Sequence, residues 1–406
     1  MEARPQKDDT GRRWRRWVFA AYVGSVLVVS FQKGLFKPDN NFAIFRASFG
    51  NLLAGRDMYA PHPEQFVDLF KYSPTFAVLF APLAVLPLPL SILLWSALNA
   101  FLLWFAVDRL IPGRRATLVL ALVYFEVLRN MQRAQSNSLV TALVILAFVA
   151  LERRRQLGAA LWICAGIFVK IFPLAAVSLA IFHGRRLRFA LIVATVLLAF
   201  IALPLLFVSP HELGAQYLAW KHVEAADALA MGGGSGAGLY GGVMEQFRLW
   251  FGVQWPNWPV QLAGTGILLL PLAVRWRERH TLDVRLRYLC SLLVFLVIFN
   301  HQSESPSFVI AVTGIAIWYA CTPRTTLHTA IVVLTILLVS ISSTDITPRW
   351  LYNHILVPYR VKTLPCALAW VIMQVELLAR RPLGSGERTE VHELDVAASE
   401  AAAQRG

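Results

Sequence analysis

A short polar run interrupts the apolar sequence near the N-terminus. The apolar stretch 17–32 is soon followed by FKPDNNFAIFRAS, residues 36–48, which places Asp39 between a proline and two asparagines. A carboxylate in that place can serve chemistry at the membrane surface. It can also act as a helix N-cap, because an Asp just before a helix accepts hydrogen bonds from its free N–H groups. Phe42 and Phe45 begin an apolar pattern of helical spacing that predicts an amphipathic helix in the interface plane.

Two further polar features lie between apolar segments. Lys170 stands in FVKIFPL, residues 168–174, where a proline breaks an apolar run. Irregular backbone at membrane depth is tolerated only inside protein or beside a cavity, so this charge is a functional candidate. A lysine that extends to the interface is the alternative. The segment NHQSES, residues 300–305, concentrates His301 and Glu304 and favours a site, with an interfacial histidine as the alternative for His301.

The elements that must position these residues are membrane helices. The chain is 57% hydrophobic and 15% charged, with a mean hydropathy of +0.56, which lies outside the range of soluble domains. Residues 189–208 carry no charge, and a bilayer requires roughly 20 such residues for one helix. The sequence therefore predicts an all-α polytopic membrane protein with about 10–13 transmembrane helices.

Basic residues come in short clusters between the apolar segments. The net charge of +14 thus indicates topology and excludes nucleic acid as a partner. The clusters include RRWRR at 12–16, ERRR at 152–155, GRRLR at 184–188 and the segment 275–287. If these face the cytoplasm, both termini do so too. The predicted outer segments are then 33–73, 129–137, a turn near 170, 209–258, 300–306 and 344–363.

Three regions follow along the chain. Residues 1–17 form a basic cytoplasmic N-terminus, 18–380 a multi-span domain and 381–406 a small, polar and acidic tail that we expect to be disordered. The outer segments 33–73 and 209–258 would bear the site. The second contains a glycine-rich stretch that we interpret as a flexible lid, because it has neither a preceding strand nor the Gly-Lys-Ser ending of a phosphate loop. The four cysteines lie in or beside apolar segments, which argues against a disulfide framework.

Several separated motifs occur in a characteristic order. They are PDNNFAIFRASFGNLLAGRDMY, DLFKYSPTFAVLFAPLAVLP, QSNSLVTALVIL and GAALWICAGIFVKIFPLAAV, followed later by NHQSESPSFVIAVTGIAIWY and KTLPCALAW. This set resembles glycosyltransferase family 87, the polyprenyl-phosphate-sugar-dependent membrane enzymes with a GT-C fold. One departure is Ala134 before Gln135, where members commonly have glycine.

The resemblance implies an active site on the non-cytoplasmic side, where Asp39 is the expected general base. The polar segment 300–305 offers Glu304 as the rival base. The chemistry agrees, because a sugar hydroxyl is a poor nucleophile until its proton is removed. A single base without a covalent intermediate inverts the anomeric configuration. A beta-linked lipid donor would then give an alpha-linked product.

The departing polyprenyl phosphate gains negative charge, which positive side chains can stabilise. No nucleotide diphosphate calls for a divalent cation, so we expect neither a metal nor a cofactor. The candidates for binding the donor phosphate are Lys170, His301, Arg360 and Lys362, ahead of Lys71 and Arg133. The candidates for binding sugar or acceptor are Tyr72, Gln135, Asn137 and Glu304, although Gln135 and Asn137 could merely cap the next helix.

The predicted function is transfer of a hexose, with mannose as the first candidate, from a polyprenyl-phosphate donor to a lipid-linked or envelope glycan. The predicted location is the inner (plasma) membrane, with the site on the periplasmic or extracellular face and membrane lipids around the helices. The alternative is a lipid or small-molecule transporter or flippase. A transporter should show inverted repeats and polar residues near the midplane, whereas here the polar candidates collect on one face. The 13 tryptophans fit an interface belt.

Overall fold

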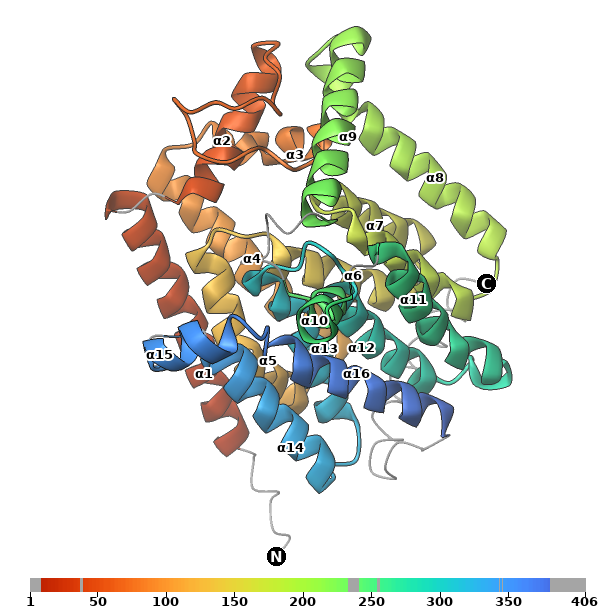
Figure 1. Cartoon of the computed structure of the whole chain (residues 1–406). Coiled ribbons are helices and arrows are strands. Elements are labelled where there is room, and N and C mark those ends of the chain that lie inside the picture. The colour runs from red at the N-terminus through yellow and green to blue at the C-terminus, as the bar shows by residue number, and fades with distance from the viewer. Residues whose placement is uncertain are drawn as a thin grey trace, which may run out of the picture.

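The computed structural model describes residues 9–36, 39–232, 241–253, 256–342, 344 and 346–379, and its regular elements in these ranges are helices (Figure 1). Lys37, Pro38, most of the glycine-rich stretch and the tail 381–406 lie outside the described residues. The α-helices are α1 (Asp9–Phe31), α2 (Asn40–Leu53), α3 (Pro74–Ala84), α4 (Leu88–Leu110), α5 (Gly113–Gln132), α6 (Asn137–Glu152), α7 (Gln156–Val169), α8 (Arg186–Ala202), α9 (Pro210–Gly232), α10 (Val243–Phe251), α11 (Asn257–Val274), α12 (Leu282–Ile298), α13 (Phe308–Cys321), α14 (Thr326–Thr335), α15 (Arg349–Leu351) and α16 (Thr363–Leu378). Shorter 3-10 and π segments are η1 (Gln32–Phe36), η2 (Phe172–Phe182), η3 (Leu203–Leu206), η4 (Trp276–Glu278), η5 (Ser305–Ser307), η6 (Ile336–Ile341) and η7 (Tyr352–Leu356).

Four of the described helices are long and apolar enough to cross a membrane: Thr10–Phe36, Leu88–Leu110, Arg186–Leu206 and Asn257–Val274. Seven further apolar helices have only 10–17 residues. Among them α6 and α13 are apolar on almost every side and nearly fully buried, as expected of helices surrounded by other helices. The predicted all-α polytopic fold is confirmed, and 10 or more crossings require the shorter helices to cross as well.

The basic cluster near the N-terminus is helical. Helix α1 starts at Asp9 and includes Arg12, Arg13, Arg15 and Arg16. Arg15 stabilises this part of the helix, since its NH1 donates to Asp108 Oδ1 at 2.9 Å and its guanidinium lies 5.2 Å from the ring centre of Trp104. Asp108 and Trp104 of α4 thus anchor the basic part of α1 through Arg15.

The predicted inner segments meet on one side of the bundle. Glu152, at the end of α6, accepts hydrogen bonds from Arg285 at 2.8 and 2.6 Å. His183 Nε2 lies 3.3 Å from the same carboxylate, and the guanidinium of Arg186 lies 4.7 Å from the ring of Trp276. Three basic turns that are distant in sequence are thereby joined, as a common cytoplasmic side would require.

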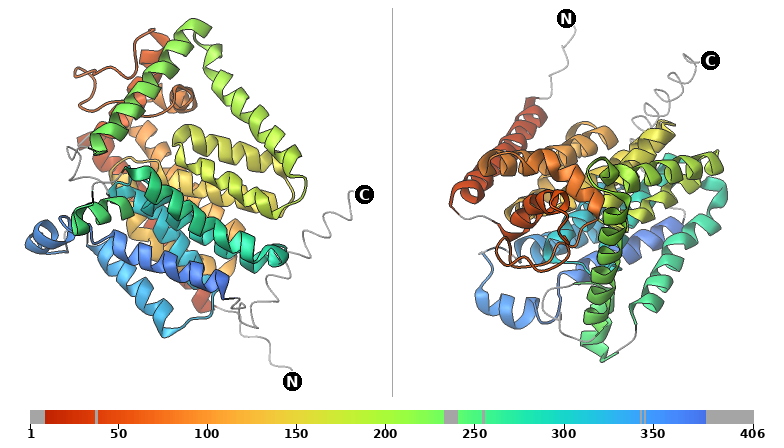
Figure 2. Two further views of the ribbon diagram at one scale, coloured as in Figure 1. Left: turned by 45° about the vertical axis from the view of Figure 1, so that its right-hand side comes forward. Right: turned by 90° about the horizontal axis from the view of Figure 1, so that it is seen from above.

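The predicted outer segments are also joined to one another. Gln216 of α9 donates to the carbonyl of Arg56 at 2.8 Å, and Gln246 of α10 donates to the carbonyl of Arg360 at 2.7 Å. In the left view of Figure 2, α2 and α9 lie at the upper left of the molecule, and α10 and α15 follow below them along the left edge. The turn between η2 and α8 lies across the bundle from them. The candidate site residues belong to the side that carries α2 and α9.

Candidate active site

Asp39 is the N-cap of α2 and also forms an ion pair. Its Oδ1 accepts a hydrogen bond from the Asn41 amide at 3.0 Å, so the N-cap interpretation is confirmed. Its Oδ2 lies 3.2 Å from Lys33 Nζ, and the two side chains are only 11% and 15% exposed. Lys33 was not among the predicted site residues, although its position at the end of the first apolar segment is a signal in the sequence. One carboxylate therefore caps a helix and faces a cation at the same time.

A tight turn between α5 and α6 connects Asp39 to the other candidates. The Asn41 side chain donates to the carbonyl of Arg133 at 3.0 Å. Ala134 follows with a φ of 47°, and its carbonyl accepts a hydrogen bond from Trp95 Nε1 at 3.0 Å. Glycine adopts this left-handed conformation without a steric penalty, which explains why glycine suits the position that alanine holds here. The start of α2 therefore contacts this turn two residues before Gln135.

Lys170 lies at the centre of a polar cluster. It follows the last residue of α7 in an extended conformation, so the predicted break is confirmed. Its Nζ donates to Asn137 Oδ1 at 2.9 Å and to Gln135 Oε1 at 3.5 Å, and Gln135 Nε2 donates to Glu304 Oε2 at 3.3 Å. Burial lowers the pKa of Lys170, while the nearby charge of Glu304 opposes that shift. Four of the predicted residues from three distant segments thus meet.

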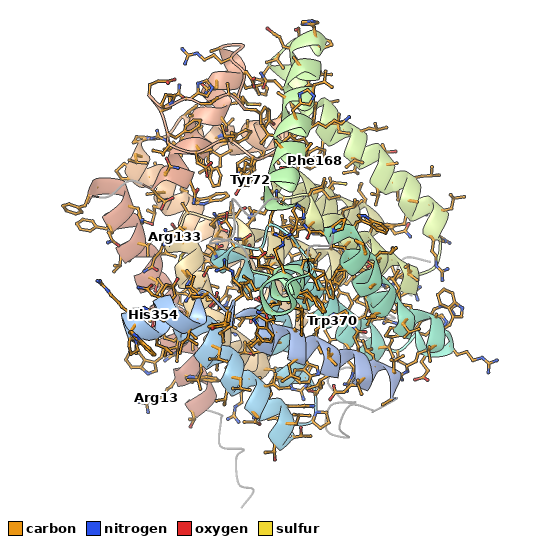
Figure 3. All side chains as sticks on the ribbon, in the orientation of Figure 1. Arg13, Tyr72, Arg133, Phe168, His354 and Trp370 are labelled. Carbon is orange, nitrogen blue, oxygen red and sulfur yellow. The ribbon has the colours of Figure 1, made fainter. Side chains whose placement is uncertain are left out.

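Tyr72 lies beside this cluster. Burial raises the pKa of its hydroxyl, the neighbouring Ser136 lowers it and the charge of Glu304 raises it further. The ring stacks on Phe76 at a centroid distance of 4.6 Å. Figure 3 shows Tyr72 close to Phe168, and Ser73 Oγ donates to the Phe168 carbonyl at 2.6 Å. The first outer loop is therefore attached to the end of α7, next to Lys170.

Lys362, near the C-terminal end of the described chain, contacts the turn that contains Glu304. Its Nζ donates to Ser305 Oγ at 2.7 Å, next in sequence to Glu304, and lies 5.7 Å from the Phe308 ring centre. Burial lowers the pKa of Lys362 to about 7, with Glu126 opposing the shift. Glu126 is fully buried and pairs with Arg129 at 2.7 Å. Ser305 belongs to the polar segment 300–305 predicted to favour a site, whereas Glu126 was not among the predicted residues.

The two remaining cation candidates are placed differently. Arg360 NH1 donates to the Val357 carbonyl at 2.8 Å, and its charge lies near Glu245, so it belongs to a group of its own on α10 and η7. His301 lies in the same turn as Glu304. Gly242 packs closely against this turn. A Cβ added at Gly242 would lie only 3.1 Å from the Asn300 carbonyl oxygen. The end of the glycine-rich segment is thus held against the residues of the polar cluster.

The cluster offers cations, amides and carboxylates. Within the described ranges, no three or more His, Cys, Asp and Glu residues are grouped so that they could hold a metal ion. Lys170 and Lys362 lie around the 304–305 turn, and Asp39 lies beyond the Arg133 turn. Such an arrangement can bind an anion on one side and accept a proton on the other.

Comparisons with known proteins agree with the earlier resemblance. The sequence model of glycosyltransferase family 87 matches residues 70–298, which include Tyr72, Gln135, Asn137 and Lys170. No curated protein matches the sequence.

Two solved structures show a distant likeness. Both are of ArnT from Cupriavidus metallidurans, one bound to undecaprenyl phosphate and one in the apo state. They are 12% and 14% identical to this chain over 90% of its length and 77% and 78% of theirs, with TM-scores of 0.37 and 0.36. The family match covers more than half of the chain and favours an enzyme over a transporter. The chain therefore belongs to glycosyltransferase family 87.

Proposed function

We propose that this membrane glycosyltransferase has a GT-C type site that moves a hexose from a polyprenyl-phosphate donor to a lipid-linked or envelope glycan. Mannose is the first candidate sugar, and the periplasmic or extracellular face of the inner membrane is the proposed location. The observation that carries the proposal is the contact between Asn41 and the Arg133 carbonyl at 3.0 Å. It holds the helix capped by Asp39 against the turn that supplies Gln135 and Asn137 to Lys170.

The acceptor hydroxyl binds at Asp39 in this proposal. As the hydroxyl oxygen attacks the anomeric carbon, its proton passes to the Asp39 carboxylate. The bond between the anomeric carbon and the phosphate oxygen breaks, and its electron pair leaves with the polyprenyl phosphate. Attack from the face opposite the leaving group inverts the configuration.

The donor binds on the side of Lys170 and Lys362. Both ammonium groups are held by neutral side-chain oxygens at 2.9 and 2.7 Å, which leaves donor capacity for a phosphate. Positive charge aimed at the departing phosphate stabilises the transition state more than the ground state. Gln135 and Asn137 then bind sugar hydroxyls, while Glu304 orients Gln135 through their 3.3 Å contact. Arg360 and His301 stay as weaker candidates for the phosphate.

The direct test uses the purified full chain in liposomes with radiolabelled polyprenyl-phosphate mannose and a lipid extract from the producing cells. We expect labelled sugar to appear in a lipid-linked or envelope glycan and the free polyprenyl phosphate to accumulate in equal amount. Polyprenyl-phosphate glucose and galactose are run in parallel, so that mannose is tested separately from the reaction class. Movement of label across the bilayer without a new glycosidic bond would instead support a flippase.

A further inference from the structure

Four arginines gather on the side of the bundle away from the polar cluster. Arg153, Arg154 and Arg155 form the turn between α6 and α7, and Arg109 lies in the last turn of α4. The turn is tight, since Arg154 has a φ of 56° and the Arg155 amide donates to the Ala150 carbonyl at 2.8 Å. Helix α4 packs against α6, and the charges of Arg109 and Arg155 both act on Arg153. All four residues are exposed, and we call them the arginine patch.

The carboxylates next to these arginines are bound to other residues. Asp108, which precedes Arg109, accepts a hydrogen bond from Arg15 NH1 at 2.9 Å. Glu152, at the start of the α6–α7 turn, accepts hydrogen bonds from Arg285 at 2.8 and 2.6 Å. Among the residues that the structure describes, no carboxylate forms an ion pair with the patch. Its positive charges are therefore left without a counter-charge from the described protein.

The crowding of these charges has an electrostatic cost. Partial burial lowers the pKa of Arg153, and repulsion from Arg109 and Arg155 lowers it further. The dipoles at the C-terminal ends of α4 and α6 favour cations and offset this repulsion for Arg109 and Arg153. Arg155 instead precedes the first turn of α7, where the dipole disfavours a cation. An anion beside the patch would remove the repulsion among all of them.

The surroundings of the patch indicate that this anion belongs to the membrane. The guanidinium of Arg109 lies 4.8 Å from the ring centre of Phe105, which is exposed on a helix long enough to cross a bilayer. Leu157, two residues after Arg155, is 58% exposed. Charged and apolar side chains thus adjoin where a spanning helix ends, the level at which a lipid phosphate meets its acyl chains. The guanidinium group also matches the geometry of phosphate oxygens.

We propose that the arginine patch binds the phosphodiester headgroup of an anionic phospholipid from the leaflet on its own side of the membrane. The phosphate pairs with Arg109, Arg153 and Arg155, while the acyl chains cover Phe105 and Leu157. The bound lipid neutralises the patch and ties the end of α4 to the α6–α7 turn. This site takes no part in the proposed sugar transfer, so either proposal can fail without the other.

The test measures lipid binding to the purified full chain by native mass spectrometry. The probes are phosphatidylglycerol, phosphatidylcholine with the same acyl chains, and glycerophosphoglycerol as the soluble headgroup. We expect the parent to prefer phosphatidylglycerol over phosphatidylcholine. The double variant Arg153→Gln, Arg155→Gln should bind phosphatidylglycerol roughly 10- to 30-fold more weakly, since each arginine near an anionic surface contributes about fivefold. Phosphatidylcholine binding should stay the same, and lysine at both positions should restore most of the preference.

The matched control is the double variant Arg188→Gln, Arg324→Gln. It removes the same number of charges from exposed arginines that lie outside the patch, in α8 and just after α13. It should bind phosphatidylglycerol as the parent does. An equal loss in both double variants would show a response to overall charge and would overturn the proposal. Equal binding of the two lipids by the parent, or displacement of phosphatidylglycerol by an equal concentration of glycerophosphoglycerol, would overturn it as well.

Discussion

Lys170 Nζ lies 2.9 Å from Asn137 Oδ1, and this contact links the broken end of α7 to the first turn of α6. Two segments that are 33 residues apart in sequence therefore share one charge-assisted hydrogen bond. The neighbouring Gln135 extends it to Glu304 at 3.3 Å. A donor phosphate that enters this cluster would find a cation whose position is already fixed.

The first prediction concerns that cation. Replacing Lys170 with Gln should weaken use of the polyprenyl-phosphate donor by about 1.5 to 3 kcal/mol, the range for losing a hydrogen bond to a charged group. The measurement is the donor KM and kcat/KM of the purified variant. Lys221→Gln, an exposed lysine on α9, is the control and should match the parent. Unchanged donor kinetics in the Lys170 variant would leave Lys170 with a purely structural role.

The second prediction separates the two carboxylates that could act as the base. Asp39→Asn should keep the cap on α2, because asparagine is as good an N-cap as aspartate, yet lose about 100- to 10,000-fold in turnover for want of a proton acceptor. Glu304→Gln should lower turnover less, since a glutamine oxygen can still accept the hydrogen bond from Gln135. Transfer rates of both variants at saturating donor decide the matter. Should the Asp39 variant retain more than about a tenth of parent turnover, Glu304 becomes the candidate base.

The third prediction concerns pH. Because burial lowers the pKa of Lys362 to about 7, its positive charge is present below that pH and is lost as the pH rises through it. We expect the donor KM to rise as the pH increases through 7. The value of kcat/KM should fall over the same range, because kcat/KM reports the pKa values of groups in the free enzyme. Lys362→Arg should abolish the dependence, since arginine stays charged. The same pH profile in parent and variant would exclude Lys362 as its source.

The fourth prediction concerns orientation in the membrane. The native cysteines Cys164, Cys290, Cys321 and Cys366 are buried, so cysteines introduced on the surface can be labelled selectively. In intact cells an impermeant thiol reagent should label cysteines at Glu64, Lys221 and Arg349. It should not reach cysteines at Arg154 and Arg277 until the membrane is opened. All five positions are exposed on the protein. Labelling of the last two in intact cells would reverse the proposed topology.

The sequence predicted those parts of the structure that depend on local spacing. The helix after Asp39, the break at Lys170 and the polar turn at Glu304 were all visible because apolar periodicity stops at each of them. The family motifs indicated that these polar residues belong to one site. The ion pair of Asp39 with Lys33 and the approach of Arg109 to Arg153 depend on how η1, α2, α4 and α6 pack. Such packing leaves no periodic trace in the sequence.

Arg360 and Lys362 are close in sequence but have different partners in the structure. Both lie in the same predicted outer segment, so the sequence predicts one role for both. In the structure Arg360 adopts a φ of 50° and lies near Glu245, whereas Lys362 reaches Ser305. A left-handed residue reverses the chain locally, so neighbours in sequence can face different partners. Sequence proximity alone could not reveal that separation.

The contact of Glu152 with Arg285 and His183 has a consequence for how the enzyme is maintained in the cell. One carboxylate, 18% exposed, joins the ends of helix hairpins on the side of the bundle away from the polar cluster. Removing one partner of a largely buried ion pair leaves the other charge uncompensated, and modest losses of stability reduce protein abundance through quality control. Inherited variation at Glu152 would therefore act on the amount of enzyme in the membrane, while each surviving molecule keeps its normal catalytic rate.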